Sequence, residues 1–446
     1  MVAVDLASPG LVIAAPNSGS GKTVVTLGLL RALRRAGVDV ASAKVGPDYI
    51  DPRFHAAASG RPCRNLDPWA MRPDTLARLA DRTAELLVVE GVMGLFDGAA
   101  DGTGSTAALA ALAGWPVVLV LDVARQGPSA AAVLHGFRSY RDDVSVAGVI
   151  LNRVGSDSHE AMIRAALEPM GVPVLGAVRR DAALDLPSRH LGLVQAEEHG
   201  DLDAFLDRAA AVLGAAVELG ALRALARPAR FAAQDAAQDA GLGAGFALPP
   251  LGQRTAIAAD AAFAFAYPHL LEDWRAQGAE LLPFSPLADA APDAGADAVF
   301  LPGGYPELHA ERLAGNRRFL DGLRAAAARG AAVYGECGGY MVLGEALEDA
   351  DGVGHAMAGL LPVATSFARR RLHLGYRRAV TLADSALGPK GTELRGHEFH
   401  YASVVSDGAG EPLFRVSDAR GDALGALGSR RGSVCGSFVH VVDRGA

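Results

Sequence analysis

The fold of the first half of the chain is decided by the stretch LVIAAPNSGSGKT, which occupies residues 11–23. Its apolar beginning, 11–15, is typical of a buried parallel strand, and residues 23–35 carry apolar side chains at helical spacing. A loop of small residues between a strand and a helix lets backbone N–H groups converge on a phosphate. The residues expected to surround that phosphate are Ser18, Gly19, Ser20, Gly21, Lys22 and Thr23.

The spacing is that of a P-loop, in which the lysine reaches the terminal phosphates of a nucleotide and the threonine hydroxyl ligates Mg²⁺. Pro16 replaces the first glycine of the pattern GxxxxGK(S/T). The alternative is an ordinary glycine-rich turn. Such a turn gives no reason for Lys22, because lysine occurs only at positions 22, 44 and 390 among 42 basic residues.

Short apolar runs alternate with helical stretches along the first half, which predicts a doubly wound α/β domain over 1–225. The runs expected to be strands are 11–15, 38–45, 86–90, 117–122, 146–152 and 172–178. Ala, Gln, Asp, Gly and Pro then crowd a stretch without strand character, interpreted as a linker at 226–252. The alternation restarts afterwards and predicts a second α/β domain over 253–446.

Two segments of the first domain, 44–52 and 90–98, follow the carboxyl ends of predicted strands. That edge is where open α/β sheets bind their ligands. Mg²⁺ takes one or two carboxylates together with nucleotide phosphates. We therefore predict that Asp48 and Glu90 share with Thr23 the metal ion of the phosphate loop.

Other aspartates in these segments have a plainer explanation as turn formers beside proline or glycine. The same explanation exists for Asp48, where we favour the metal role. For Asp51 and Asp97 both interpretations stay open, because each lies next to a turn residue and also near the expected ligand edge.

The second domain contains VYGECGGY at 333–340, which predicts a strand, a tight turn and a helix. This is a nucleophile elbow with Cys337 in place of serine, in which the N–H of Gly338 points into an oxyanion hole. A second donor is expected from the loop LPGGY at 301–305, at Gly304. The alternative is a buried structural cysteine.

A thiolate nucleophile needs a base that also protonates the leaving amine, normally a histidine. The candidates are His355, His373, His397, His400 and His440. His440 lies in a terminal apolar strand, where it is either this base or a core histidine bonded to a backbone carbonyl. His397 and His400 also raise the question of zinc, but in a strand they point to opposite faces, which argues against it.

Charge and composition exclude several classes of function. The balance of 42 basic against 50 acidic residues gives a net charge of -8, which argues against sequence-independent binding to nucleic acid or to an anionic bilayer. No run approaches the roughly 20 apolar residues of a membrane span. Cys63, Cys337 and Cys435 form neither a disulfide framework nor a metal motif, so a cytoplasmic setting is expected, with Cys63 and Cys435 as structural thiols.

Nearly all of the 446 residues resemble the cobyrinic acid a,c-diamide synthase family. The resemblance is carried in the first half by residues 18–23, 44–52, 90–98 and 187–193. In the second half it is carried by 284–287, 302–308, 336–339, 374–377 and 396–401. This family joins a dethiobiotin-synthetase-like ATPase domain to a class I glutamine amidotransferase domain.

The resemblance implies an ATP-dependent amidation. L-Glutamine is hydrolysed at Cys337 through a thioester, with His440 as the base, and the ammonia passes to the first domain. There ATP phosphorylates the c and then the a acetate side chain of a corrinoid acceptor, and each acyl phosphate becomes an amide. Support for the acceptor or the chemistry is implied for Lys44, Tyr49, Asp51, Asp97, Ser188, Arg189 and His190.

The chain departs from the family pattern near its end. Class I amidotransferases often carry a glutamate two residues after the histidine, where this chain has Val442, and the usual Tyr-x-His-x-His is altered at 438–442. This suggests a Cys-His dyad or a third member from elsewhere.

Other readings of the whole chain stay open. The alternatives are a nickel-sirohydrochlorin a,c-diamide synthase, a cobyric acid synthase, and a P-loop switch ATPase whose amidotransferase domain only binds. The intact elbow at Cys337 argues against the last. The sequence does not decide between a metal-free and a cobalt-containing acceptor, and it leaves a homodimer open.

Overall fold

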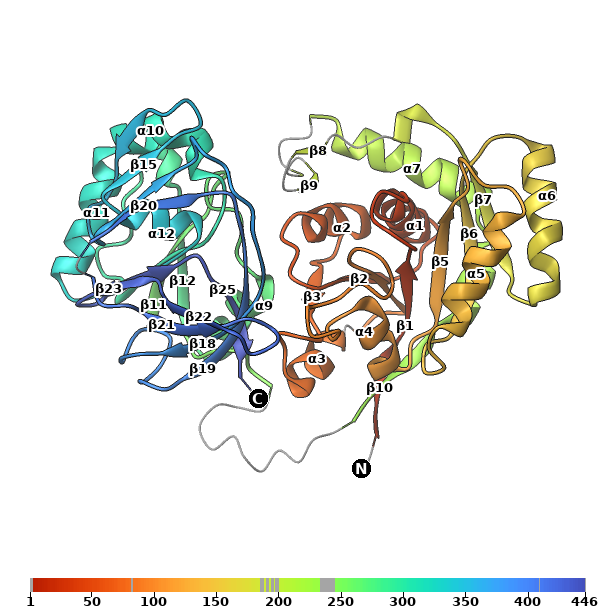
Figure 1. The fold of residues 1–446 in the computed structure, drawn as a ribbon, viewed down its shortest axis with the longest axis horizontal. Coiled ribbons are helices and arrows are strands. Elements are labelled where there is room, and N and C mark those ends of the chain that lie inside the picture. Colours follow the sequence, from red (N-terminus) through yellow and green to blue (C-terminus); the bar gives the residue numbers. More distant parts are fainter. Residues whose placement is uncertain are drawn as a thin grey trace. The chain divides into compact units, whose positions relative to one another are not determined.

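A computed structural model describes residues 3–81, 83–184, 188–189, 192–193, 196, 200–232, 245–408 and 410–445. Its internal contacts divide the chain into two units. The first comprises Met1–Trp69 and Pro73–Asp239, and the second comprises Ala70–Arg72 and Ala240–Ala446. Figure 1 shows both units with their elements, and each is described by itself.

The first unit is built on a sheet of eight strands in the order β3-β2-β4-β1-β5-β6-β7, with β10 paired antiparallel to the first part of β1. The strands are β1 Ala3–Ala14, β2 Val40–Val45, β3 Arg64–Leu66, β4 Leu86–Glu90, β5 Val117–Asp122, β6 Val146–Val154, β7 Val174–Arg179 and β10 Arg227–Ala232. The seven strands of the main order are parallel. This confirms the predicted α/β class.

Helices cover both faces of this sheet. They are α1 Lys22–Arg35, α2 Asp51–Ser59, α3 Pro73–Ala80, α4 Thr106–Ala113, α5 Ser129–Ser139, α6 Asp157–Leu167, α7 Leu202–Ala216 and α8 Leu219–Leu225. In Figure 1, α1, α2 and α7 lie above the strands, and α3 and α4 lie below them. Covering both faces explains the continuous apolar runs: Leu11, Val12 and Ile13 are fully buried, each contributing about 1.5–3 kcal/mol.

The linker prediction differs from the structure at its start. Strand β10 falls inside the range 226–252 and pairs with β1 from Ala3↔Ala232 to Gly10↔Arg227. The stretch therefore belongs to the sheet of the first unit until Ala232. Its sequence, RPARFA, is short and contains proline, a residue tolerated at a sheet margin, so it carries little strand signal.

The second unit contains a six-stranded sheet in the order β12-β11-β13-β14-β24-β23. Its strands are β11 Arg254–Ala258, β12 Glu280–Phe284, β13 Ala298–Leu301, β14 Ala332–Glu336, β23 Ser429–Arg431 and β24 Val434–Ser437, and its helices are α9 Pro268–Ala276, α10 Ala310–Gly315, α11 Arg317–Ala328 and α12 Gly338–Leu343. All pairs are parallel except β23 with β24.

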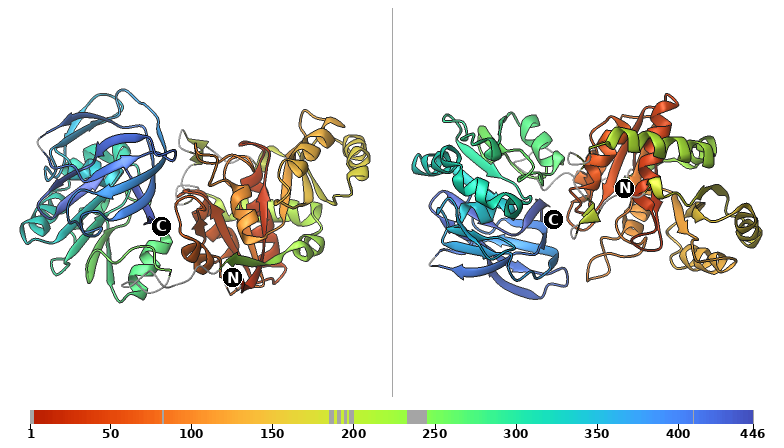
Figure 2. Two further views of the ribbon diagram at one scale, coloured as in Figure 1. Left: turned by 60° about the horizontal axis from the view of Figure 1, so that its bottom comes forward. Right: turned by 90° about the horizontal axis from the view of Figure 1, so that it is seen from above.

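Two further sheets of this unit were not predicted. One has the order β22-β21-β18-β19-β25 and the other β16-β15-β17-β20. Their strands are β15 Ala346–Glu348, β16 Gly354–Ala356, β17 Val363–Ser366, β18 His373–Thr381, β19 Glu393–His400, β20 Ser403–Asp407, β21 Phe414–Ser417, β22 Ala423–Leu427 and β25 His440–Arg444. Figure 2 shows these strands, coloured blue, from two further directions.

The chain changes sheets close to its end. Strand β24 is the last parallel strand beside β14, and β25 begins three residues later and pairs antiparallel with β19. Ser437 and His440 therefore belong to different sheets, although they are close in sequence. Within the described parts of the chain, no helix combines the length and the apolar character that crossing a membrane requires.

Candidate functional site

The phosphate loop of the first unit connects β1 to α1, and its shape is fixed by two glycines and by the end of β6. Gly19 and Gly21 have φ angles of 83° and 81°, a region that favours glycine. Asn152 donates its side-chain amide to the carbonyl of Ser20 at 2.8 Å, and Arg153 donates to the carbonyl of Gly19 at 3.0 Å. Sequence reasoning missed both residues, although polar side chains at a strand end were a signal.

A side chain at Gly21 would not fit, because a Cβ there would lie 2.3 Å from the Asn152 amide nitrogen. The helix that follows begins at Lys22, one residue before the start of the predicted helical stretch at residue 23. The Lys22 side chain is buried, and burial together with the neighbouring Lys44 charge lowers the pKa of its ammonium. An anionic ligand would relieve that unfavourable charge.

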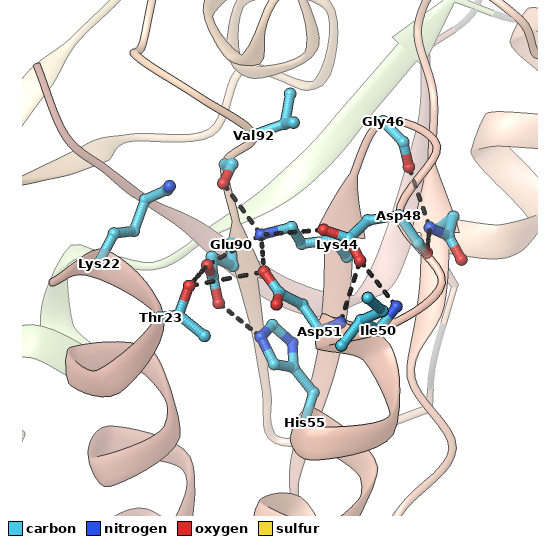
Figure 3. Close-up of polar contacts among 12 residues, drawn as sticks. Lys22, Thr23, Lys44, Gly46, Asp48, Ile50, Asp51, His55, Glu90 and Val92 are labelled. Atoms are coloured by element: carbon cyan, nitrogen blue, oxygen red, sulfur yellow. Dashed lines mark hydrogen bonds and ion pairs between the residues drawn. The ribbon is translucent and has the colours of Figure 1, made fainter. Parts of the chain in front are cut away.

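A cluster of charged side chains lies beside this loop, at the carboxyl ends of β2 and β4 (Figure 3). The Lys44 ammonium lies 2.5 Å from Asp51 Oδ2 and 2.9 Å from Glu90 Oε1. The Thr23 hydroxyl donates to Glu90 Oε1 at 2.6 Å and lies 3.5 Å from Asp51 Oδ2. The structure thus brings Thr23, Asp51 and Glu90 together around a buried cation.

Asp48 lies beside the cluster, in the turn before α2. Its Oδ1 accepts the backbone N–H groups of Ile50 and Asp51 at 2.8 Å and 3.0 Å, and its Oδ2 is 4.0 Å from Lys44 Nζ. The carboxylate that approaches Thr23 is that of Asp51. The physical reason is that α2 begins at Asp51, so Asp48 closes the preceding turn while Asp51 faces the strand ends.

The electrostatics of the cluster are strongly coupled. Burial works against the Lys44 charge, but Asp51, Glu90 and Asp48 raise the pKa of this ammonium. Burial also opposes the Glu90 charge, yet Lys44 and His55 keep the pKa of Glu90 well below its ordinary value. For Asp48, burial and the neighbouring Asp51 charge raise the pKa to about 6.

His55 is a further member of the cluster that sequence reasoning missed. It lies four residues after Asp51 on α2, a spacing that places both on one helix face. Its Nε2 is 2.5 Å from Glu90 Oε2, and its Nδ1 is 3.6 Å from the Cys63 sulfur. Although burial opposes it, the Cys63 and Glu90 charges raise the pKa of His55 to about 10. His55 therefore holds Glu90 Oε2 in place, while Thr23 donates to Oε1 of the same carboxylate.

The remaining predicted residues of the first unit lie in other segments of the chain. Asp97 accepts the N–H of Gly94 at 2.9 Å and is exposed, as a turn former would be. Tyr49 lies in the connection between β2 and α2. Ser188 and Arg189 form the short strand β8, paired with β9 Gly192–Leu193. His190 lies outside the described residues.

In the second unit, Cys337 occupies the turn between β14 and α12. Its φ of 47° and ψ of -104° lie outside the regions that a residue with a side chain normally adopts. The backbone N–H of Cys337 donates to the carbonyl of Ser437 at 2.8 Å. The strained turn of a nucleophile elbow is therefore present at the predicted residue.

The glycine loop after β13 lies directly against this turn. A Cβ at Gly303 would be 2.4 Å from His440 Cε1 and 3.4 Å from Cys337 Cβ, so no side chain fits there. The backbone nitrogen of Gly304 would be 3.1 Å from a Cβ at Gly338. The structure thus brings together the predicted nucleophile, base and two glycines.

His440 is the one of the five predicted bases that lies against Cys337. It is buried, but the Cys337 charge and then Glu336 overcome this burial and raise the pKa of His440 to about 9. Its ring stacks on His397 with centroids 5.0 Å apart. Burial and the His440 charge hold the pKa of His397 well below its ordinary value, and His397 meets the Tyr267 hydroxyl at 2.7 Å.

The other candidate bases have other contacts. His355 lies 2.8 Å from Asp349, and His373 stacks on His400 with centroids 4.7 Å apart. Across the described portion of the chain, no group of three or more His, Cys, Asp or Glu side chains is arranged to hold a metal ion. Cys63 and Cys435 are buried and free, in keeping with structural thiols.

Comparison with known proteins gives two family matches. Residues 11–194 match the CobQ/CobB/MinD/ParA nucleotide binding domain. Residues 254–445 match the CobB/CobQ-like glutamine amidotransferase domain. These boundaries place the phosphate loop and the cysteine elbow in separate families that are joined in one chain.

Several full-length relatives are similar to the chain. A hydrogenobyrinate a,c-diamide synthase of Brucella abortus biovar 1 (strain 9-941) is 60% identical over 439 residues, which cover 97% of this chain and 98% of the relative. The protein of the same name from Rhizobium meliloti (strain 1021) is 58% identical, with 97% and 99% covered. That of Agrobacterium fabrum (strain C58 / ATCC 33970) is 52% identical, with 98% and 99% covered.

Proposed function

The chain belongs to the hydrogenobyrinate a,c-diamide synthase family, and on this premise we propose that it amidates the a and c acetate groups of hydrogenobyrinic acid with ATP and glutamine. The observation that carries the proposal is the meeting of Cys337, His440 and the loop of Gly303 and Gly304 in a chain that also has a phosphate loop. One site releases ammonia and the other activates a carboxylate.

The glutaminase half-reaction follows from the second unit. The Cys337 thiol passes its proton to His440 and its sulfur attacks the side-chain amide carbon of glutamine, and the N–H groups of Gly338 and Gly304 stabilise the oxyanion. His440 gives its proton to the leaving nitrogen, so ammonia departs and a thioester forms. Water, deprotonated by His440, then attacks the thioester, releasing glutamate and restoring the thiol.

The synthetase half-reaction follows from the first unit. An acetate oxygen of the acceptor attacks the terminal phosphorus of ATP, ADP leaves, and an acyl phosphate forms. Ammonia then displaces phosphate from the acyl carbon and leaves the carboxamide. Lys22, held at the start of α1, would neutralise charge on the transferred phosphoryl group. The ammonium of Lys44 would support the chemistry by holding the Asp51 and Glu90 carboxylates in place beside Thr23.

The cluster around Lys44 fits Mg²⁺. Asp51, Glu90 and Thr23 present two carboxylates and a hydroxyl, the hard oxygen donors that this ion takes beside nucleotide phosphates. When bound, Mg²⁺ would neutralise phosphate charge. We therefore propose Asp51 in the ligand role that the sequence suggested for Asp48. His55 holds the second oxygen of Glu90 in place.

Hydrogenobyrinic acid is proposed as the acceptor because relatives with that substrate in their name match over nearly the whole chain. The test is to incubate the purified chain with ATP, Mg²⁺, glutamine and either hydrogenobyrinic acid, cobyrinic acid or nickel-sirohydrochlorin, and to identify products by mass spectrometry. We expect the a,c-diamide from the metal-free acid. Amidation of only a metal-containing acceptor would overturn this choice.

We also propose that the chain works in the cytoplasm, where ATP and glutamine are supplied and its three free cysteines stay reduced. Fractionation of cells with antibody detection tests this location. Whether two chains associate stays a prediction, and sedimentation of the purified protein at several concentrations would measure it.

A further inference from the structure

The catalytic histidine lacks an acid at the position where class I amidotransferases often have one. Two residues after His440 stands Val442, which is fully buried and apolar. Its carbonyl accepts from His269 Nε2 at 2.9 Å, so this part of β25 is committed to packing. The acid that β25 does carry, Asp443, is bonded to the backbone and guanidinium of Arg72, so we expect the carboxylate that orients His440 to come from another element.

We propose that Glu336, the residue directly before the nucleophile, is the positioning residue for His440. Glu336 Oε2 lies 3.7 Å from His440 Nδ1, and the two side chains are 3% and 1% exposed. Glu336 ends β14, whereas His440 begins β25. The two residues are brought together because β14 pairs with β24 immediately before the chain changes sheets. This inference rests on the proposed glutaminase function.

The Glu336 carboxylate is held so that one oxygen faces the imidazole. Its Oε1 accepts from the Tyr334 hydroxyl at 2.9 Å and from the Val441 N–H at 3.1 Å. Tyr334 is itself fixed by stacking on Phe300, with centroids 5.8 Å apart and planes 9° apart. Because Val441 follows His440, this anchor connects the acid to the strand that carries the base. Oε2 is the oxygen left to face His440.

The protonation states around this pair are consistent with the role. Cys337 and Glu336 face His440 from β14 and its turn, and His397 faces it from β19. Burial and the Glu336 charge raise the pKa of Tyr334 well above its ordinary value, so this hydroxyl stays protonated and donates. The low pKa of His397 keeps it uncharged, so it covers one ring face without competing for a proton.

The chemical effect is on the tautomer and charge of His440. A carboxylate at Nδ1 holds the proton there and leaves Nε2 for the thiol, and it stabilises the imidazolium formed when the thiol ionises. At 3.7 Å the contact is not a hydrogen bond. Such contacts are often long without substrate and shorten when substrate binds, so we expect this one to close with glutamine.

Glu336→Gln is the decisive variant. The amide oxygen still accepts from Tyr334 and Val441, so the anchors survive while the charge is lost. We expect kcat for glutamine hydrolysis to fall on the order of 10²-fold, with KM for glutamine nearly unchanged. The alkaline limb of the kcat profile should move to lower pH, because His440 loses the charge that stabilises its protonated form. Synthesis with free ammonia should stay at the wild-type rate.

Two further variants make the test specific. Glu336→Asp keeps the charge and should restore the alkaline limb and part of kcat, whereas Glu311→Gln, an exposed change on α10, should behave as wild type. If Glu336→Gln does not fold, Glu336→Asp and Tyr334→Phe carry the test, with a several-fold lower kcat and an unmoved alkaline limb expected for both.

Wild-type kcat and an unmoved alkaline limb in folded Glu336→Gln would overturn the proposal, as would Glu336→Asp no better than Glu336→Gln. If Glu336→Gln does not fold, wild-type kcat in both Glu336→Asp and Tyr334→Phe would overturn it. Failure of the proposed function would look different, because the wild-type chain itself would then release no ammonia from glutamine.

Discussion

The two units hold their reactive groups in opposite ways. In the first, Lys44, Asp51 and Glu90 neutralise one another at 2.5 Å and 2.9 Å, and Lys22 is the buried cation that awaits an anionic ligand. In the second, Cys337 is held in a strained backbone conformation, and the acid nearest to His440 stops at 3.7 Å. The carboxylates of the first site are already paired with a cation, whereas the second site is preorganised by its backbone and its acid and base are not yet in hydrogen-bond contact.

The difference reflects the ligand that each site is proposed to bind: Mg²⁺ and phosphates in the first unit, and glutamine in the second. A site for Mg²⁺ and phosphates must keep several buried charges compatible before those ions arrive, because an unpaired buried charge is costly. A thiol nucleophile is neutral until it ionises, so its site needs no counter-charges in advance. It relies instead on backbone geometry, namely the strained turn at Cys337 and the glycine loop packed against that turn. Variants should therefore separate the two activities.

Cys337→Ser should give the largest effect. Glutamine-dependent synthesis should fall by at least about 10⁴-fold, because the hydroxyl is a far weaker nucleophile than the thiolate beside His440. Synthesis with ammonium chloride should persist, because the synthetase site is separate. Both rates are measured by product chromatography with hydrogenobyrinic acid. Loss of the ammonia-dependent rate as well would contradict the independence of the two sites.

Lys22→Ala should reverse that pattern. ATP-dependent amidation is expected to fall about 10³-fold with either nitrogen source, since a buried cation at the start of α1 is removed from the transferred phosphate. Glutamine hydrolysis should continue when measured as glutamate release. Lys390→Ala, which changes an exposed lysine, is the matched control. An unchanged rate of synthesis in Lys22→Ala would contradict the proposal that Lys22 binds the phosphates of ATP.

Asp51→Asn and Asp48→Asn compare two carboxylates three residues apart. We expect Asp51→Asn to lower synthesis about 10²-fold and to raise the Mg²⁺ concentration needed for half-maximal rate, because it removes a ligand beside Thr23. Asp48→Asn should cost less than about threefold, because an asparagine oxygen still accepts the two N–H groups. An equal loss of the synthesis rate in both variants would indicate that Asp48 is also a ligand of Mg²⁺.

The sequence predicts the elements whose signal is local. The parallel strands of the first unit, the phosphate loop and the cysteine elbow all consist of neighbouring residues with distinctive composition. The choice between Asp48 and Asp51 depends on where α2 begins, a matter of one helical turn that composition does not fix. His55 and Asn152 approach their sites only through packing between distant segments.

The contact between Glu336 and His440 depends on pairing between strands that are far apart in the sequence. It exists because β14 and β24 pair before the chain crosses into the sheet of β19 and β25. The antiparallel sheets that make this crossing carry weak patterns, and β22 is largely exposed, so their strands lack a strict alternation. The pairing between distant strands therefore could not be predicted from local sequence patterns.

The smallest expected effect is on stability, and it concerns the second unit alone. His440 has a pKa of about 9 in the folded chain, above the ordinary value of 6.5, because the Cys337 and Glu336 charges outweigh its burial. The folded state therefore holds this proton more tightly than the unfolded state. Its stabilising contribution is complete below pH 6.5 and is lost as the pH rises towards 9.

This shift limits the contribution of His440 to about 3 kcal/mol, and we expect about 2 kcal/mol because the Cys337 charge is part of the same equilibrium. Cys337→Ala removes the larger cause, so the loss of stability between pH 6.5 and 9 should become smaller. Hydrogen exchange of β13 and β24, corrected for the intrinsic pH dependence, measures this. Protection of β4 in the first unit, where the His55–Glu90 pair sets its own pH response, should show the same pH slope in Cys337→Ala and wild type and serves as the control. An equal pH slope in Cys337→Ala and wild type would mean that the thiolate does not stabilise the protonated base, and the second site would then rest on its backbone geometry alone.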